Sequence, residues 1–80
     1  AHSFMTDPIT AIKEGKIKQL PGANLEDEDL AGLDLSDFNL VGASLVGTDL
    51  SNSKLERTRL EGANLLGSRL CHADLRANLL

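Results

Sequence analysis

Cys71 and His72 are the residues of this sequence best suited to chemistry, and they stand next to each other. A thiolate and an imidazole can both ligate zinc, but a structural zinc site needs about four such ligands. The second histidine of the chain is His2, far away in sequence. No general base stands at a recognisable spacing from Cys71, so a nucleophilic role has little support. We interpret the pair as variable surface residues and predict no catalytic residue, metal site or cofactor.

Acidic and glycine-rich segments also fail to supply a catalytic constellation. Glu28 has no second catalytic group placed near it in the pattern described below. The glycines recur at regular spacing and no Gly-Lys-Ser/Thr sequence follows them, so they are interpreted as bends rather than a phosphate loop. The repeat is expected to leave no concave pocket. We therefore predict that the protein is not an enzyme.

Composition narrows the class of protein. The chain has 80 residues, enough for one domain, and its aromatic content is 2%, so leucine and small residues must build the interior. The net charge of −4 opposes binding to nucleic acids or anionic membranes. No apolar run approaches the roughly 20 residues of a membrane span, and no signal peptide is visible. With Cys71 as the single cysteine, we expect a cytoplasmic protein.

The element that must position these residues is defined by leucine, which occupies every fifth position from Leu20 to Leu80. On an α-helix five residues turn the chain by about 140°, which would scatter the leucines around the axis. On a straight strand an odd spacing would place successive leucines on opposite faces. The chain must therefore bend within every unit so that each leucine faces one interior.

A second and longer period, spanning four such units, lies over the first. Gly-Ala-Asn-Leu at 22–25 returns as Gly-Ala-Ser-Leu at 42–45 and as Gly-Ala-Asn-Leu at 62–65. In most units a small residue stands two positions before the leucine, facing inward, and a polar residue stands one position before it, facing outward. Four units bending by about 90° each would close one square turn of a solenoid, with coils about 4.8 Å apart.

These copies resemble the pentapeptide-repeat family, whose units follow an A(D/N)LXX pattern. The resemblance covers about residues 22–80. It implies an all-β fold, a right-handed quadrilateral β-helix of about three coils, with four pentapeptides per coil. It also implies a short α-helix that caps the N-terminal end.

A helix is predicted over about residues 8–14, with Asp7 as its N-cap, Pro8 in its first turn and Gly15 just beyond its end. Residues 1–4 are interpreted as a cloning remnant, 5–20 as the helical cap and lead-in, and 21–80 as the β-helix. Leu33 and Phe38 stand at inward positions where other units have small residues. We expect either that the coil is widest there or that they pack on this helix beside Ile9 and Ile12, rather than that they line a ligand pocket.

Charged residues in the pattern give further predictions. Glu28 falls at an inward position, so residues 27–29 are expected to bulge outward, or Lys16 or Lys18 to pair with Glu28. Residues that are four units apart should stack. The predicted cross-coil neighbours are Asp34, Lys54 and Asp74 in one column, Asp37 over Arg57, and Glu56 over Arg76.

Two functions are weighed. The first is a rigid scaffold that binds a protein partner, or a second copy of itself, through a smooth face carrying Val46 and Leu66 or through an open C-terminal coil carrying Leu79 and Leu80. Because the coil would end in exposed leucines, we also consider that the natural chain continues beyond Leu80. The alternative comes from the resemblance: some acidic members mimic duplex DNA and bind DNA gyrase or topoisomerase IV.

Overall fold

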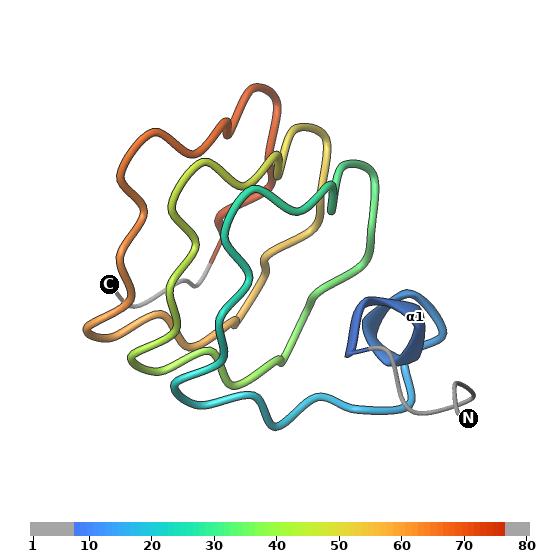
Figure 1. Cartoon of the computed structure of the whole chain (residues 1–80). Helices are drawn as coiled ribbons and strands as arrows, with labels where there is room; N and C mark the ends of the chain where they lie inside the picture. Colours follow the sequence, from blue (N-terminus) through green and yellow to red (C-terminus); the bar gives the residue numbers. More distant parts are fainter. Residues whose placement is uncertain (1–7, 77–80) are drawn as a thin grey trace.

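The chain winds into a solenoid of stacked coils with a short helix at one end (Figure 1). The computed structural model describes residues 8–76. Helix α1 spans Pro8–Lys13, which confirms the predicted helix to within one residue. Gly15 follows with a φ of 71°, the left-handed conformation that ends many helices. The proposed N-cap, Asp7, lies outside the described residues. No helix within 8–76 is long and apolar enough to cross a bilayer.

Single-residue parallel bridges hold the coils together, and every bridge joins a residue to its equivalent four units later, as Asn24 is joined to Ser44. The N–H of Leu45 donates to the carbonyl of Asn64 at 2.8 Å, and the N–H of Asn64 donates to the carbonyl of Ala43 at 2.9 Å. The same pattern recurs at each ladder leucine from Leu20 to Leu55, so each coil has four sides and the predicted longer period is confirmed. The right-handed sense of the coil remains a prediction.

The four sides are named here by the residues that stack in them. Side 1 contains residues 23–25, 43–45 and 63–65, side 2 contains 28–30, 48–50 and 68–70, side 3 contains 33–35, 53–55 and 73–75, and side 4 contains 18–20, 38–40 and 58–60. The lead-in after α1 thus pairs with side 4 alone, through the bridge of Gln19 and Asn39.

The interior is a leucine ladder lined by small residues. The ladder leucines, at every fifth position from Leu25 to Leu60, are at most 3% exposed, as the spacing predicts. Threonine and serine also occupy inward positions because their hydroxyls find carbonyl partners there. The hydroxyl of Thr48 donates to the carbonyl of Leu25 at 2.7 Å, and that of Ser53 donates to the carbonyl of Leu50 at 2.6 Å.

Each corner is a tight turn with one residue in the left-handed region. At Gly42 the φ is 69°, and the following N–H of Ala43 donates back to the carbonyl of Leu40 at 3.0 Å. Glycine adopts this conformation without steric cost. Arg57 and His72 occupy equivalent positions with a φ of 61°, so these two corners carry backbone strain that the surrounding stack must hold.

Where an Asp or Asn stands before the ladder leucine, its side chain closes the next corner. The side-chain Oδ1 of Asn39 accepts a hydrogen bond at 3.1 Å from the N–H of Val41, two residues later. This pairing satisfies a backbone donor that the turn leaves without a carbonyl partner. The sequence analysis placed these side chains outward but did not predict this role. The same bond forms at Asn24, Asp29, Asp34, Asp49, Asn64 and Asp74.

These corner bonds predict a loss of stability in acid. Hydrogen bonds from Ser51 lower the pKa of Asp49, and those from Ser36 lower the pKa of Asp34, relative to the ordinary value of 3.8. The unfolded chain therefore binds protons first, so stability is full above pH 3.8 and falls as the pH drops through the lowered pKa values. Urea unfolding at several pH values measures this slope.

The D49N variant keeps a side-chain oxygen for the N–H of Ser51 but has no proton to gain. It is expected to show a shallower loss of stability in acid than the parent chain. Equal slopes for the two proteins would contradict the assignment of the acid sensitivity to the Asp49 corner.

The first coil is where residues depart from the repeat. Phe38 is 1% exposed and shares a buried cluster with Ile12 of α1, with Leu33 packed at the edge, which confirms the predicted cap contact. The predicted bulge at Glu28 is wrong. Its carbonyl accepts the N–H of Asp49 at 3.0 Å in the regular stack.

The alternative prediction for Glu28, a lysine partner, is also wrong: within residues 8–76 no ion pair joins Glu28 to Lys16 or Lys18, and Lys16 pairs with Glu14 instead. Glu28 is tolerated because it is only half-buried. No described coil stacks beneath side 2 of the first coil, so the long side chain can carry its charge toward solvent.

Candidate protein-interaction surfaces

Val46 and Leu66 stack on each other at the corner between sides 1 and 2. The N–H of Gly47 donates to the carbonyl of Leu66 at 2.9 Å, which fixes this stack. Leu66 is 71% exposed and Val46 is half-buried. We call these two residues, with Ser44 and Asn64 of side 1, the lateral surface. Its residues carry no charge.

The lateral surface is limited to the second and third coils by the acidic residues of the first. In the column of Val46 and Leu66, the first coil has Glu26. The hydroxyl of Ser44 donates to Oε2 of Glu26 at 2.8 Å, so this carboxylate turns toward the edge of the surface. A partner that covers the lateral surface would therefore meet an apolar centre and one acidic border.

The C-terminal coil exposes part of its interior. The predicted interface residues Leu79 and Leu80 lie outside the described residues. Within them, Leu75 is 41% exposed and Leu65 is half-buried, whereas Leu55 and Leu45, their equivalents one coil earlier, are 0% exposed. We call Leu65, Leu70 and Leu75 the C-terminal rim. The sequence analysis did not predict Leu75 as an exposed residue of this surface. The ladder pattern could have indicated it, because within the described residues the last coil packs only against the coil before it.

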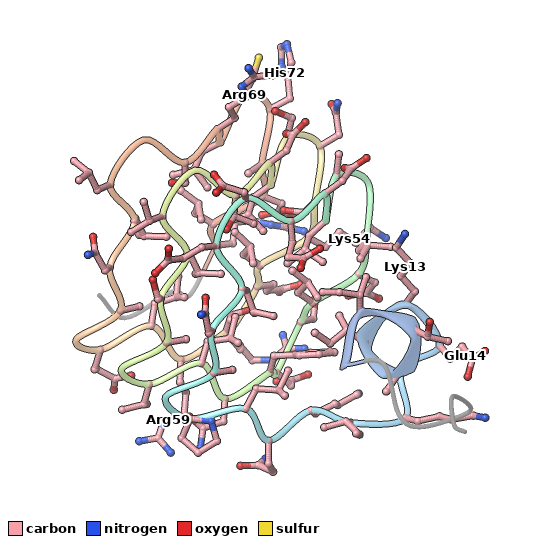
Figure 2. All side chains as sticks on the ribbon, in the orientation of Figure 1. Lys13, Glu14, Lys54, Arg59, Arg69 and His72 are labelled. Atoms are coloured by element: carbon pink, nitrogen blue, oxygen red, sulfur yellow. The ribbon has the colours of Figure 1, made fainter. Side chains whose placement is uncertain are left out.

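Cys71 and His72 stand on an exposed corner between sides 2 and 3. The carbonyl of Cys71 accepts the N–H of Asn52 at 2.8 Å, so the pair has the same corner role as its counterparts. Figure 2 shows His72 and Arg69 projecting from the upper edge of the molecule. Across residues 8–76, no three His, Cys, Asp or Glu side chains gather as they would around a metal ion.

Two of the predicted cross-coil charge pairs form along the corner between sides 3 and 4. In the third predicted column Asp34, Lys54 and Asp74 stack on side 3, but within residues 8–76 no ion pair joins Lys54 to either aspartate. Arg57 donates to both carboxylate oxygens of Asp37, at 2.8 and 3.1 Å, and approaches Glu56 at 3.0 Å. Arg76 lies 3.8 Å from Glu56 and 2.8 Å from Asp74. Water screens exposed pairs of this kind and they add little to stability, so their main effect is to favour the correct register.

A cleft of about 520 Å³ lies beside this corner, where the end of α1 and the lead-in meet the first two coils. The expectation that the fold leaves no concave pocket is therefore wrong. The cleft arises because the helix packs against one part of the first coil, and the repeat does not specify that placement. Its lining residues are Ile12, Lys13, Glu14, Gly15, Lys18, Leu33, Asp34, Ser36, Asp37, Phe38, Lys54, Glu56 and Arg57.

Comparisons with known proteins agree on the repeat. The family model described as pentapeptide repeats matches residues 19–57 and 53–78, with eight copies. The crystal structure of alr5209, a pentapeptide repeat protein from Nostoc Pcc 7120, is 32% identical to this chain, with a TM-score of 0.36. The match covers 91% of this chain and 73% of that protein. Comparison with curated proteins gives no match.

Proposed function

Because the chain belongs to the pentapeptide-repeat family, whose members are generally non-enzymatic repeat scaffolds, we propose that it is a rigid platform that binds a protein partner. The stacked bridges make each side continuous with the next coil, which suits a surface that holds its shape on binding. Such a function needs no catalytic or metal-binding residues. It needs exposed apolar side chains that are held in fixed positions by a rigid backbone.

The main support for this proposal is that several leucine side chains of the third coil are exposed. Leu66 of the lateral surface is 71% exposed and directly follows Leu65 of the C-terminal rim, and Leu75 is 41% exposed. Apolar residues that gather on one part of a surface are typical of interaction sites, whereas singly scattered ones are ordinary. The third coil is thus the favoured contact region.

We propose a second copy of the chain as the occupant of this end. In the second coil, the N–H groups of Leu45, Leu50 and Leu55 donate to carbonyls of the third coil. The equivalent N–H groups of the C-terminal rim donate to no carbonyl within residues 8–76. An unpaired edge of this kind pairs readily with another edge, so two C-terminal coils would satisfy each other. Leu79 and Leu80 are included in this proposed interface.

The solution mass, measured by light scattering, tests the proposal. We expect the wild-type chain to be a dimer and both Leu66→Glu and the double variant Leu79→Glu/Leu80→Glu to be monomers, because a buried carboxylate without a partner opposes association. Ala31→Glu, on an exposed corner of the first coil, is the matched control and should remain a dimer. A monomeric wild-type chain, or dimers in all four proteins, would exclude self-association through the third coil.

The scaffold function is favoured over DNA mimicry by the distribution of charge. Six acidic residues, and no basic residue, lie in residues 21–40, whereas residues 41–76 carry four acidic and five basic residues. Duplex DNA carries about one charge per 1.7 Å along its whole axis, so a mimic needs acidic residues in every coil. In the second and third coils the basic residues outnumber the acidic ones, so these coils do not carry the net negative charge that a mimic needs.

A further inference from the structure

The first coil has an unpaired backbone edge on side 2. One coil later, the N–H of Asp49 donates to the carbonyl of Glu28 at 3.0 Å, and the carbonyl of Asp49 accepts the N–H of Leu30 at 2.9 Å. The equivalent residue of the first coil is Asp29, and neither its N–H nor its carbonyl bonds to a backbone group within residues 8–76. We call residues 28–30 of the first coil the side 2 edge. An edge of this kind can accept an added strand.

The lead-in shows how an extended segment pairs with the same edge on side 4. The N–H of Asn39 donates to the carbonyl of Lys18, and the N–H of Leu20 donates to the carbonyl of Asn39, both at 2.8 Å. Asn39 has the position on side 4 that Asp29 has on side 2. Figure 1 shows the lead-in running along one side of the first coil, from α1 to the start of the repeats. A short extended segment is thus enough to pair with one side.

The side 2 edge and the corner before it carry the net negative charge of the protein. Residues 26–29 are all acidic, and no Lys or Arg nitrogen within residues 8–76 lies within 4.0 Å of their carboxylates. The other eight acidic residues of the chain are matched in number by its eight basic residues, so residues 26–29 account for the whole net charge of −4. A partner that covers this edge would therefore gain from carrying positive charge.

Glu28 favours a cation most directly. It stands at the inward position of side 2, in the column of Thr48, and is half-buried. A strand added beneath side 2 would place one of its own side chains in this column, as the lead-in places Lys18 in the column of Phe38. An apolar residue there would bury the carboxylate without a partner, whereas Lys or Arg would pair with it.

We propose that the side 2 edge binds an extended segment of a partner protein that is rich in Lys and Arg. The backbone of the segment would pair with the N–H and the carbonyl of Asp29, and its cations would donate hydrogen bonds to the carboxylates of Glu26 and Glu28. The proposal rests on the proposed function, because it names one chemical class of partner for the same scaffold. It uses the opposite end of the solenoid from the C-terminal rim.

Binding of fluorescein-labelled hexalysine, followed by fluorescence anisotropy in low salt, tests the choice of partner. We expect the wild-type chain to bind this peptide and not hexaserine with the same label. Glu26→Gln/Glu28→Gln is expected to weaken binding at least about ten-fold, because two charge-assisted hydrogen bonds are lost. The control Glu14→Gln/Glu56→Gln removes the same charge from residues that pair with Lys16 and Arg57 instead. It should weaken binding by less than about three-fold, because salt screens charges that are far from the peptide.

Hydrogen exchange at the amide of Asp29 tests the backbone pairing. This N–H has no backbone acceptor within residues 8–76, so it should exchange quickly in the free protein and slowly when hexalysine is bound. The amide of Asn39 is the internal control, because the lead-in already pairs with it, and its exchange should not change. A peptide held by charge alone would leave the exchange of Asp29 unchanged.

Four results would each overturn the proposal. Failure of the wild-type chain to bind hexalysine would mean that the carboxylates only keep this edge from pairing with other edges. Equal weakening by the two double variants would exclude the role of Glu26 and Glu28, and unchanged exchange at Asp29 would exclude strand pairing. Slower exchange at Asp29 as the protein concentration rises, without peptide, would assign the edge to a second copy of the chain.

The two proposals fail separately. A dimer that Leu66→Glu dissociates, together with no binding of hexalysine, would leave the scaffold function standing and remove the role of the side 2 edge alone. Binding of hexalysine by a monomeric wild-type chain would support the side 2 edge and exclude self-association through the third coil.

Discussion

Replacing Phe38 with alanine is expected to lower the free energy of unfolding by about 3–5 kcal/mol. The side chain is 1% exposed and stands where other coils place residues such as Thr58, so its loss leaves a large cavity in the first coil. The same side chain shares its buried cluster with Ile12. Because α1 has only six residues, it needs this contact to remain helical.

Chemical unfolding measures the loss of stability, and hydrogen exchange shows whether α1 is released. The N–H of Glu14 donates to Thr10 and that of Lys16 to Ala11, both at 3.0 Å. We expect these two amides to lose protection in the Phe38→Ala variant. The control Thr58→Ala, one coil further on, should leave them protected. Unchanged protection in Phe38→Ala would show that Phe38 does not anchor the helix.

Replacing Leu55 with alanine is expected to cost about 2–5 kcal/mol, the second large effect. Leu55 is 0% exposed and lies in the middle coil, with ladder residues of side 3 on both sides along the axis. In a solenoid each coil packs only on its neighbours, so a cavity in the middle coil removes contacts with two coils at once.

Leu75 is the matched control, because it occupies the same ladder position one coil later and is 41% exposed. Leu75→Ala is expected to cost about 1 kcal/mol, since less apolar surface is buried there and solvent can fill the space. Urea unfolding of both variants gives the comparison. Equal costs would mean that the third coil is packed as tightly as the second, and would argue against an exposed C-terminal rim.

The sequence predicts the solenoid well because its signal is repeated. The position of Leu45 in the ladder is supported by its equivalents Leu25 and Leu65. In the same way, the turn at Gly42 is supported by the equivalent glycines, Gly22 and Gly62. Stacking of equivalent residues in successive coils then follows, so the pair of Asp37 and Arg57 could be predicted from the sequence alone. What repeats in the sequence repeats in the structure, and each copy supports the others.

The predictions failed where the repeat stops. The chain keeps its regular path at Glu28 because no described coil stacks beneath this residue, so its side chain can reach solvent. The five residues around Glu28 do not reveal that it lies in the first coil. The cleft was not predicted for a similar reason. The position of α1 depends on how Ile12 packs against Phe38, and the leucine repeat contains no information on this contact. The sequence shows that Asp and Asn, such as Asn39 and Asp49, are frequent directly before the leucine. The spacing alone does not show that their side chains accept a hydrogen bond from the backbone N–H two residues later.

The bridges join equivalent positions of successive coils, and this spacing also sets which changes in length the fold can accept. Deleting a single residue would place every later leucine out of register with the coil before it. Removing one pentapeptide between Asp34 and Lys54 would preserve the ladder but rotate all later surface residues by one side, so that Arg59 would stack on Asp34 in place of Lys54. Only the gain or loss of a whole coil keeps every face intact, and duplication of whole coils is therefore the step by which a gene of this kind can lengthen without rebuilding its surfaces.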